Sequence, residues 1–587
     1  MWYYINKSLL RGVILMMTED FKVIGGNGTV TLDKMVINNI TYLTVDVKYD
    51  SPVIPEKFYV TWNISGEGCS AIWHPFERNH ILRPDWGMNE MNSRLASGMP
   101  IYQILSADNK NTICFSVSDV DTPIKLKTGY IEETAEMKCE VEFFSMPIGV
   151  TEEYKAVIRV DCRNIPYYDS IYETRQWWED EFGLEGAYVP KYAKLPMDSL
   201  WYSFHQDLDF DEIIEECKLS YSLGMKTVII DDGWQTGDNN RGYAYCGDWE
   251  AYEPKMGDMT ALVDEIHKIG MKVVLWYSVP FMGIYAKNYD RFKDMLLDDS
   301  GNNTDFFALD PRYKEVRYYL SCIYEKAVRE WGLDGLKLDF IDSFVLKGKS
   351  LEYDNRRDTE SLEEGIHLLL SDVTRRLRAL NPDILIEFRQ SYIGPSICKY
   401  GNMLRVGDCP ADYLSNRSQI IDMRYTSGKT AVHSDMLMWS KSEPVEFAAL
   451  QIANSIFGVP QISVKINEMP EKHLEMIRFY LDFWLENRDI LLGGKLVGYH
   501  PENGYSKAIC TLKNKSVVAL YTDNVVKVES DSCIIVNAGT NKTVILKTIK
   551  DMKYKIVNCV GDVVEEGIVD SALVELEVPV SGIIFLS

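Results

Sequence analysis

The stretch Gly335-Leu336-Lys337-Leu338-Asp339-Phe340 is the most informative part of this chain. Its apolar residues predict a short buried strand, and because the side chains of a strand alternate between two faces, Lys337 and Asp339 point the same way. A cation beside a carboxylate keeps that carboxylate ionised and available as a nucleophile. The sequence therefore predicts a reactive acid at the end of a buried strand.

A second apolar run, Val228-Ile229-Ile230, ends in Asp231-Asp232-Gly233-Trp234. Two apolar strands that both end in acids indicate a parallel barrel with its chemistry at the carboxyl-terminal rim. Adjacent carboxylates repel each other, and a fold tolerates them best where donors such as sugar hydroxyls bind both. Gly233 permits a tight turn, and Trp234 offers a flat apolar face. A solvated loop is the alternative interpretation.

Strand-like and helix-like runs alternate from about residue 195 onward. The amphipathic helical stretches include residues 211–223, 261–268 and 362–380, the last closed by Asn381-Pro382. Eight βα units in roughly 300 residues are the number that a (β/α)8 TIM barrel requires. The predicted strands are residues 199–204, 227–231, 272–276, 335–339, 384–388, 403–406, 430–433 and 461–463.

The segments before and after these units alternate with the period of two that strands show. We expect an α/β chain in three parts: an N-terminal β-sandwich over residues 1–185, the barrel over 190–492, and a C-terminal antiparallel β-sandwich over 493–587. The clearest strand patterns in the flanking parts are residues 29–32, 42–47, 138–143, 156–160, 516–521, 543–546 and 582–586.

Length and composition exclude several classes of protein. With 587 residues, 46% of them hydrophobic, the chain can build two to four domains with sizeable cores. A net charge of −25 repels phosphate backbones and anionic membranes, so nucleic-acid binding is not expected. The aromatic content of 12% fits carbohydrate-binding surfaces, although large cores also use aromatic residues.

The cysteine pattern and the hydropathy argue for a cytoplasmic protein. The 12 cysteines include no CxxC pair and no Cys/His cluster, so neither a zinc site nor a disulfide framework is expected. Residues 1–17 contain Lys7 and Arg11 but only a short apolar run, which is not a convincing signal peptide. No run of about 18 apolar residues predicts a membrane span.

A third predicted strand also ends near acids, in the run Met403-Leu404-Arg405-Val406-Gly407-Asp408. Asp408 is placed to be a second carboxylate at the rim. A glycosidase needs two carboxyl groups that flank the bond it cleaves. Asp412 follows closely and is the competitor for that role.

Three further features invite a functional interpretation. Trp276 ends an apolar run and is expected either in a pocket wall or in the barrel core, and Arg389 places a cation at another strand end. The run His433-Ser434-Asp435 suggests a hydrolase triad, but triad partners meet in space rather than in sequence, and no G-x-S-x-G elbow frames the serine.

These motifs, in this order, resemble those of the α-galactosidases of glycoside hydrolase family 36 (melibiases), with families 27 and 31 as more distant relatives. The resemblance rests on short motifs between about residues 195 and 465, whose joint order and spacing are specific. They are Asp231-Asp232-Gly233-Trp234, Gly270-Met271-Lys272-Val273-Val274-Leu275-Trp276, Lys337-Leu338-Asp339 and Arg405-Val406-Gly407-Asp408.

The resemblance implies an exo-acting retaining α-galactosidase that works by double displacement without a cofactor or metal. It implies that Asp339 is the nucleophile and Asp408 the acid/base, with their carboxyl groups roughly 5 to 6 Å apart. It also implies an oligosaccharide or glycoconjugate substrate. The resemblance implies that Asp231 and Asp232 bind the 4- and 6-hydroxyls of the sugar, and that Lys337, Trp276 and Arg405 form other walls of its pocket. From their positions at strand ends, Trp234 and Arg389 are also expected to bind the substrate.

The chain departs from the family pattern in three places. Phe388-Arg389-Gln390-Ser391-Tyr392 replaces a Cys- and Gly-rich turn beside the sugar 2-hydroxyl, and the stretch that follows Trp276 lacks the usual Glu. The stretch around Asp408 lacks the usual flanking residues. Together these departures keep an α-N-acetylgalactosaminidase, another α-glycosidase or a transglycosylase open as alternatives, although Arg389 argues against an acetamido group at C2. A non-catalytic carbohydrate-binding protein is a further alternative.

The resemblance also suggests assembly with further copies of the chain. Enzymes of this family are often oligomers in which N-terminal residues complete a neighbour's active site. Trp73 or Trp86 is expected to be such a residue if this chain forms a homo-oligomer.

Overall fold

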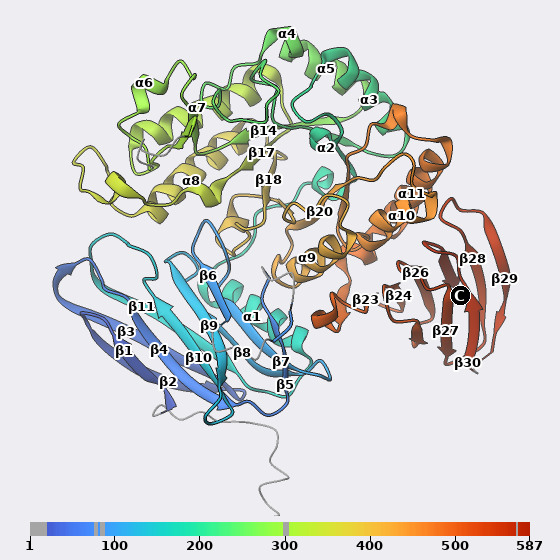
Figure 1. Cartoon of the computed structure of the whole chain (residues 1–587), viewed down its shortest axis with the longest axis horizontal. Helices are drawn as coiled ribbons and strands as arrows, with labels where there is room; N and C mark the ends of the chain where they lie inside the picture. The colour runs from blue at the N-terminus through green and yellow to red at the C-terminus, as the bar shows by residue number, and fades with distance from the viewer. Residues whose placement is uncertain (1–19, 76–79, 83–88, 298–303, 571–572) are drawn as a thin grey trace, which may run out of the picture.

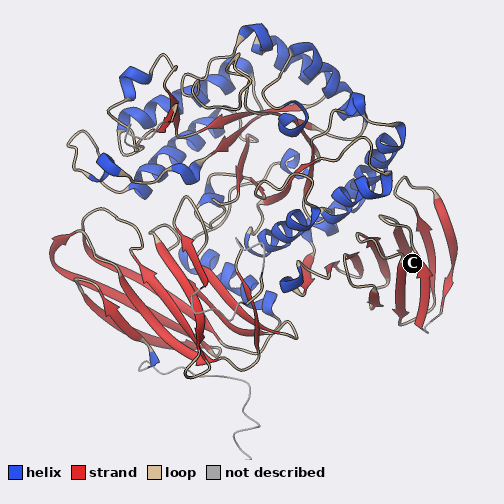
Figure 2. Ribbon diagram, in the orientation of Figure 1, coloured by secondary structure: helices blue, strands red, loops and turns tan. Residues whose placement is uncertain are grey.

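The computed structural model describes residues 20–75, 80–82, 89–297, 304–570 and 573–587. A closed barrel forms the central part of the chain, with β-sheets built from the residues before it and after it (Figure 1). Strands dominate the two flanking parts, whereas helices surround the strands of the barrel (Figure 2). The predicted fold class is therefore confirmed. The N-terminal segment 1–17 and Trp86 lie outside the described residues.

The N-terminal part is a sandwich of a five-stranded sheet, β1-β4-β10-β9-β6, and a six-stranded sheet, β2-β3-β11-β8-β7-β5. Alternate residues of the facing strands form one buried cluster, which includes Val45, Trp62, Phe115 and Val141. The strands are β1 (Lys22–Gly25), β2 (Thr29–Ile37), β3 (Ile40–Val53), β4 (Phe58–Ser65), β5 (Cys69–Trp73), β6 (Asn89–Ser93), β7 (Ile101–Ser106), β8 (Asn111–Val117), β9 (Ile124–Ile131), β10 (Glu136–Phe143) and β11 (Thr151–Asp161).

A helix that the strand patterns do not predict, α1 (Tyr167–Phe182), connects this sandwich to the barrel. It ends at Gly183, whose φ of 61° is the left-handed conformation that favours glycine after a helix. The buried face of α1 includes Ile171 and Trp178, and the helix packs against β8 of the sandwich and α9 (Tyr413–Thr426) of the barrel. The expectation of strands up to residue 185 is wrong for this segment.

The barrel closes in the order β12-β13-β14-β17-β18-β19-β20-β21, with every neighbouring pair parallel. All eight overlap the predicted strands, but the first does so only at Ser199. That strand is three residues long, and the other residues predicted to be extended, 200–204, form a short helix. The strands are β12 (Met197–Ser199), β13 (Thr227–Ile230), β14 (Lys272–Ser278), β17 (Gly335–Asp339), β18 (Leu385–Arg389), β19 (Met403–Arg405), β20 (Ala431–Leu437) and β21 (Val459–Ile462).

Four helices of the barrel begin where a side chain satisfies a free backbone amide. Asp209, Asp258, Ser361 and Asp412 each accept a bond from an amide in the first turn of a helix. Besides α9, the helices are α2 (Leu200–Phe204), α3 (Phe210–Ser222), α4 (Glu253–Met256), α5 (Met259–Ile269), α6 (Tyr289–Phe292), α7 (Lys314–Trp331), α8 (Leu362–Leu380), α10 (Val445–Asn454) and α11 (Glu471–Gly493). A hairpin of β15 (Phe281–Gly283) and β16 (Phe306–Ala308) follows β14.

The C-terminal part has a seven-stranded sheet, β22-β23-β24-β26-β31-β28-β29, and a three-stranded sheet, β25-β27-β30. Most pairs are antiparallel as expected, but β24 with β26 and β25 with β27 run parallel. The strands are β22 (Lys495–Tyr499), β23 (Lys507–Leu512), β24 (Lys515–Leu520), β25 (Val525–Val528), β26 (Ser532–Asn537), β27 (Thr543–Thr548), β28 (Met552–Val557), β29 (Val563–Val569), β30 (Leu573–Glu577) and β31 (Ile583–Leu586).

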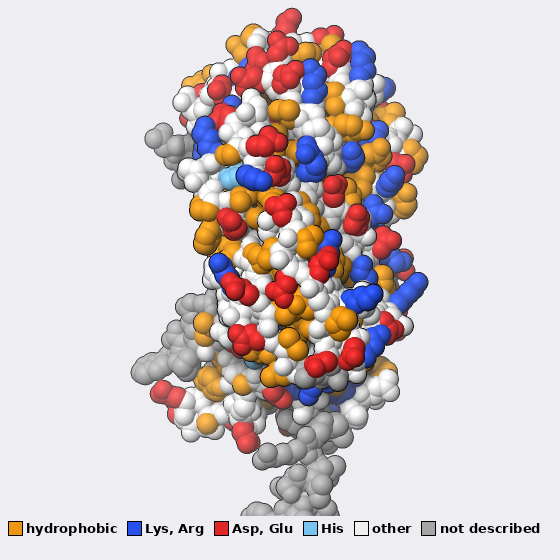
Figure 3. All heavy atoms as spheres, turned by 90° about the vertical axis from the view of Figure 1, so that its right-hand side faces the viewer, with side chains coloured by type: hydrophobic (Ala, Val, Ile, Leu, Met, Phe, Trp, Pro, Cys, Tyr) orange, Lys and Arg blue, Asp and Glu red, His pale blue; other side chains and the backbone are white. Residues whose placement is uncertain are grey.

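The surface on the C-terminal side mixes acidic, basic and hydrophobic side chains (Figure 3). Across the described part of the chain, no helix has the length and apolar character needed to cross a bilayer.

One buried carboxylate joins all three parts of the chain. Asp422 of α9 accepts hydrogen bonds from Trp73 Nε1 across 2.7 Å and from the hydroxyl of Tyr505, and its other oxygen lies 3.0 Å from His80 Nε2. Trp73 is fully buried in these contacts. The expectation that Trp73 reaches the active site of a neighbouring copy is therefore wrong, because its side chain is packed within its own chain.

Candidate active site

The parallel register brings the predicted residues to one end of the barrel. Trp276 of β14 pairs with Lys337 of β17, and Arg389 of β18 pairs with Arg405 of β19. Their side chains surround a cavity of about 80 Å³ at the carboxyl ends of the strands. The lining residues are Trp201, Asp231, Asp232, Tyr243, Trp276, Lys337, Asp339, Phe340, Arg389, Arg405, Asp408 and Met436.

Asp339 ends β17 and is the most strongly held carboxylate of the cavity. Its Oδ1 accepts bonds from Arg389 Nε at 2.6 Å, from the amide of Phe340 at 2.7 Å and from the Tyr392 hydroxyl at 3.1 Å. Its Oδ2 accepts one bond, from Trp276 Nε1 at 3.0 Å. Burial alone would raise the pKa of Asp339, but Arg389 and then Lys337 outweigh it and hold that pKa well below its usual range. Asp339 is therefore an ionised carboxylate at neutral pH.

Lys337 makes its direct contact with a different acid. Its Nζ lies 2.6 Å from Asp231 Oδ2, and both side chains are buried. Burial would lower the pKa of Lys337, but the Asp231 charge more than offsets this and raises it. The lysine thus remains a cation, with its closest bond to the acid that follows β13.

Asp232 faces the cavity beside Asp231 but is held by amides. Gln206 Nε2 donates to one of its oxygens at 2.6 Å, and Gln235 Nε2 donates to the other at 2.7 Å. Burial raises the pKa of Asp232 to about 6. The two adjacent acids therefore differ in their partners: Asp231 is paired with the Lys337 cation, whereas Asp232 accepts bonds from the neutral amides of Gln206 and Gln235. Both are buried, so the solvated-loop interpretation is wrong.

Asp408 lies at the mouth of the cavity, where 59% of its side chain is exposed. Its Oδ1 accepts a bond from Arg405 Nη1 at 2.9 Å, and this guanidinium lowers the pKa of Asp408 more than burial raises it. The same Nη1 donates to Asp435 Oδ1 at 2.5 Å inside the barrel. Arg405 is thus a buried cation shared between Asp408 and Asp435.

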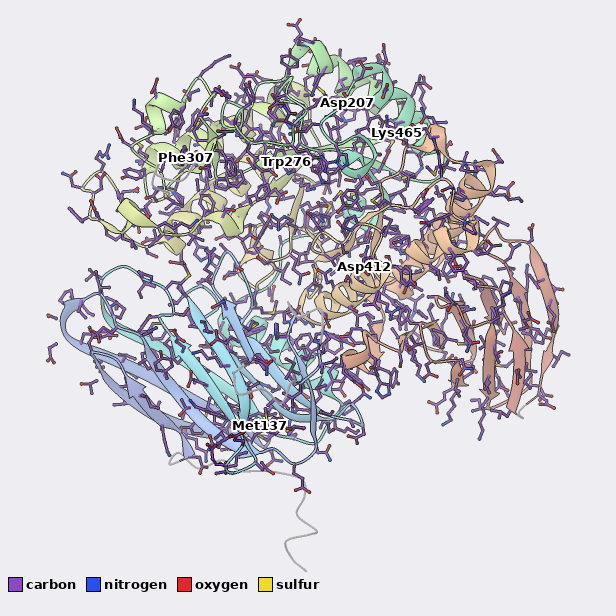
Figure 4. All side chains as sticks on the ribbon, in the orientation of Figure 1. Met137, Asp207, Trp276, Phe307, Asp412 and Lys465 are labelled. Carbon is purple, nitrogen blue, oxygen red and sulfur yellow. The ribbon has the colours of Figure 1, made fainter. Side chains whose placement is uncertain are left out.

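Asp412, the competitor for the role of Asp408, caps a helix instead of facing the cavity. It begins α9 as the N-cap and accepts bonds from the amide and the hydroxyl of Ser415, at 3.0 and 2.5 Å. Asp412 is absent from the cavity lining, which includes Asp408. Trp276 and Asp412 are both labelled in Figure 4, Trp276 among the barrel strands and Asp412 by α9.

The two tryptophans predicted at the site differ in position. Trp276 lines the cavity and donates to Asp339, so it is a wall residue rather than only a core residue. Trp234 is fully buried behind it and donates from Nε1 to the carbonyl oxygen of Trp276 across 2.8 Å. Its ring packs against Trp249 and Tyr277. The expectation that Trp234 offers a face to a sugar is corrected: it supports Trp276 from behind.

Several residues of the site carry no signal in the sequence. Trp201, Tyr243, Phe340 and Met436 line the cavity although none of them was predicted to be a site residue. Phe340 follows Asp339 directly, and its φ of 64° turns its own amide back onto the carboxylate. Trp201 lies in α2, where a strand was expected. The aromatic content of the composition was the available signal for Trp201, Tyr243 and Phe340, and Met436 had none.

The run His433-Ser434-Asp435 does not form a triad. His433 Nε2 lies 2.8 Å from the carbonyl oxygen of Ala193, and Ser434 Oγ accepts a bond from the amide of Gln461. Asp435 pairs with Arg405 instead. Among the described residues, no group of three or more His, Cys, Asp or Glu side chains is arranged to hold a metal ion.

A larger cavity of about 910 Å³ lies away from this rim. It is bordered by α1, by the C-terminal end of α11 and by the residues that precede β20. None of the predicted site residues lines it. Volume alone therefore does not identify the reactive site, whereas the converging carboxylates and cations do.

Comparisons of sequence place this chain near the melibiases. Residues 194–398 match the profile of the family described as Melibiase. The bifunctional α-galactosidase/sucrose kinase AgaSK of Mediterraneibacter gnavus is 27% identical over 192 residues, which are 32% of this chain and 19% of that protein. An A type blood α-D-galactosamine galactosaminidase of Flavonifractor plautii is 22% identical over 308 residues, 48% of this chain and 27% of that protein. The chain thus spans about a fifth to a quarter of the length of these relatives.

Comparisons of structure extend the likeness to the whole chain. The galactosidase domain of AgaSK aligns with a TM-score of 0.63 at 14% identity and covers 98% of this chain and 83% of that one. A form of the α-galactosidase AgaA of Geobacillus stearothermophilus, solved with raffinose, aligns with a TM-score of 0.63 at 13% identity over 98% and 84%. This chain therefore carries a melibiase-like barrel and has the fold of the glycoside hydrolase family 36 α-galactosidases.

Proposed function

We propose that this chain is an exo-acting retaining glycoside hydrolase that releases a terminal α-galactosyl residue. One observation carries the proposal: two carboxylates in contrasting surroundings line the same cavity at the barrel rim. Asp339 is 7% exposed and fixed by four donors, as a nucleophile requires. Asp408 is mostly exposed at the mouth, where a leaving group departs and water enters.

The proposed reaction has two displacements. In the first, Asp339 attacks the anomeric carbon, and the bond from that carbon to the leaving oxygen breaks. Asp408 gives this oxygen a proton, which it must carry in the complex with substrate although Arg405 lowers its pKa in the free chain. In the second, Asp408 takes a proton from water, the water oxygen bonds to the anomeric carbon, and Asp339 leaves as a carboxylate. Oδ2 is the attacking atom that the contacts favour, since it accepts one bond and Oδ1 accepts three.

The acids after β13 support a galactosyl substrate. Asp231 and Asp232 are buried acceptors on the same cavity wall, suited to two neighbouring sugar hydroxyls. The names of the relatives, α-galactosidase and α-D-galactosamine galactosaminidase, agree with a galactose-configured sugar. We also propose that the chain acts in the cytoplasm as a homo-oligomer; cell fractionation and light scattering test these two points.

A different substituent at C2 is the second candidate specificity. Arg389 is only 17% exposed and bonds directly to Asp339, so a large cation lies close to the carbon next to the anomeric centre. Such a residue favours a small or hydrogen-bond-accepting group over a bulky apolar one.

Hydrolysis of a panel of p-nitrophenyl α-glycosides, followed by proton NMR of the first-formed anomer, tests the proposal. Release from the α-galactoside with α-galactose appearing first is the expected result. Activity only on another α-glycoside, with retention of the anomeric configuration, would leave the proposed mechanism standing but assign a sugar other than galactose as the substrate. β-Galactose appearing first would overturn the retaining mechanism. No activity with any member, even when a sugar acceptor is added for transglycosylation, would favour a non-catalytic carbohydrate-binding protein.

A further inference from the structure

Arg389 touches two carboxylates of the site. Its Nε lies 2.6 Å from Asp339 Oδ1, and its Nη1 lies 3.7 Å from Asp342 Oδ2. The guanidinium carbon lies 5.1 Å from the centre of the Phe340 ring and 5.5 Å from that of Tyr392. These rings and the bond from Nη1 to the carbonyl oxygen of Gln390, at 2.7 Å, restrict the guanidinium to the space between the two acids.

Asp342 is a carboxylate with unused bonding capacity. Its Oδ2 accepts one bond, from Ser391 Oγ at 3.0 Å. Its Oδ1 is buried and has no hydrogen-bond partner among the described residues. Burial raises the pKa of Asp342, which the nearby Arg389 charge opposes. A buried acceptor without a hydrogen-bond partner is costly, and the guanidinium of Arg389 lies 3.7 Å from the other oxygen of this carboxylate.

The N-terminal sandwich fixes the backbone around Asp342. Arg94 donates from Nη2 to the carbonyl oxygen of Asp342 and from Nη1 to that of Phe344, both at 2.7 Å. The amide of Gly98 donates to the carbonyl oxygen of Ser391 at 2.9 Å. The segments that contain Asp342 and Ser391 are thus bonded to residues of the N-terminal part. The position of Asp342 therefore does not depend on Arg389 alone.

The proposed reaction changes the charge that Arg389 faces. When Asp339 bonds to the anomeric carbon, its carboxylate becomes a neutral ester and no longer pairs with the guanidinium. The leaving oxygen takes its proton from Asp408, so no proton reaches Arg389. The buried cation then needs another anion. Asp342 is already within 3.7 Å.

We propose, on the basis of the retaining mechanism above, that Arg389 shifts its ion pair from Asp339 to Asp342 as the covalent intermediate forms. It returns to Asp339 when the intermediate is hydrolysed. Asp342 is then a positioning residue: it stabilises the intermediate through Arg389 and does not touch the sugar. Its removal leaves Arg389 bound more tightly to Asp339 in the free enzyme, which slows formation of the ester more than its hydrolysis.

The test separates the two steps with 5-fluoro-α-galactosyl fluoride, which leaves a long-lived glycosyl-enzyme that intact-protein mass spectrometry detects. We expect Asp342→Asn to slow labelling about tenfold while reactivation in buffer changes less than threefold. Asp342→Glu, which restores the charge, should recover most of the labelling rate. Equal slowing of both steps, or no slowing of either, would overturn the proposal.

A double-mutant cycle distinguishes an effect of Asp342 that acts through Arg389 from a general disturbance of the folded structure. In an Arg389→Gln background, the further change Asp342→Asn should alter the labelling rate less than twofold, because the shared cation is gone. A full tenfold effect in that background would show that Asp342 acts without Arg389 and would contradict the inference. If the wild-type chain is not labelled at all, the proposed function fails; if it is labelled and the variants behave like it, only this inference fails.

Discussion

Lys337 Nζ lies 2.6 Å from Asp231 Oδ2, so the lysine that precedes Asp339 by two residues bonds to the acid of another strand. The cation that contacts Asp339 directly is Arg389, from β18. The site is therefore a network of charges across β13, β17, β18 and β19. No single motif contains both partners of any of its inter-strand ion pairs.

Asp339→Asn should lower kcat by about 10⁴-fold or more, because it removes the group that forms the covalent bond. Galactose binding should persist, since Asp231, Asp232 and Trp276 remain. Steady-state kinetics and calorimetric titration with galactose measure the two effects. Turnover within tenfold of the wild type would assign the nucleophile elsewhere.

Asp408→Ala should lower turnover of natural oligosaccharides by roughly 10²–10⁴-fold, because both proton transfers are lost. On a p-nitrophenyl substrate, azide should restore much of the rate and yield an α-glycosyl azide. The matched control is Asp412→Ala, which removes the N-cap of α9 at a cost of about 1 kcal/mol of stability and should leave kcat unchanged. Azide rescue of the control variant instead would exchange the two roles.

Asp232 should make the free energy of unfolding depend on pH. Its pKa of about 6 in the folded chain exceeds the usual 3.8. Its contribution to stability is therefore fully present below pH 3.8 and is lost as the pH rises through 6. The free energy of unfolding of Asp232→Asn, relative to that of the wild type, should therefore rise by on the order of 2–3 kcal/mol between pH 4 and pH 7. Denaturant titrations at both pH values measure this gain, and a difference independent of pH would refute it.

Arg389→Gly should widen the tolerance for substituents at C2, because it empties the space beside Asp339. It should also raise the pKa of Asp339, since burial remains while the nearest cation is gone. The acidic limb of the profile of kcat/KM against pH should therefore move to higher pH. Rates with 2-deoxy and 2-acetamido substrates across pH values provide the measurement. An unchanged substrate preference together with an unmoved acidic limb would mean that Arg389 does not shape the site.

Asp422→Ala should destabilise the chain by several kcal/mol, because it leaves buried donors of Trp73 and Tyr505 without an acceptor at about 1–3 kcal/mol each. Since Asp422 joins all three parts, thermal unfolding should also become less cooperative in calorimetry. Asp489→Ala, at a carboxylate that is 89% exposed, is the control and should change stability by less than about 0.5 kcal/mol. Similar melting curves for both variants would contradict the joining role of Asp422.

The barrel and most of the residues at its carboxyl-terminal rim could be predicted from the sequence alone. Apolar runs that end in Asp231, Asp339 and Asp408 locate strand ends from local pattern alone, because parallel strands of a barrel all point their carboxyl ends the same way. Eight of the nine predicted site residues line one cavity for this reason. The failure at residues 199–204 has a local cause, since a three-residue strand is too short to show the alternation that identifies it.

Which charges pair, and which aromatic rings face the cavity, depends on the tertiary structure. Lys337 with Asp231 and Arg389 with Asp339 are contacts between strands, set by register and by the inward tilt of side chains, and a linear pattern does not contain them. Trp234 and Trp276 both lie near a strand end in the sequence, yet one supports the other from behind. The contacts also distinguish Asp408 from Asp412, because Asp408 forms an ion pair with Arg405 whereas Asp412 is the N-cap of α9.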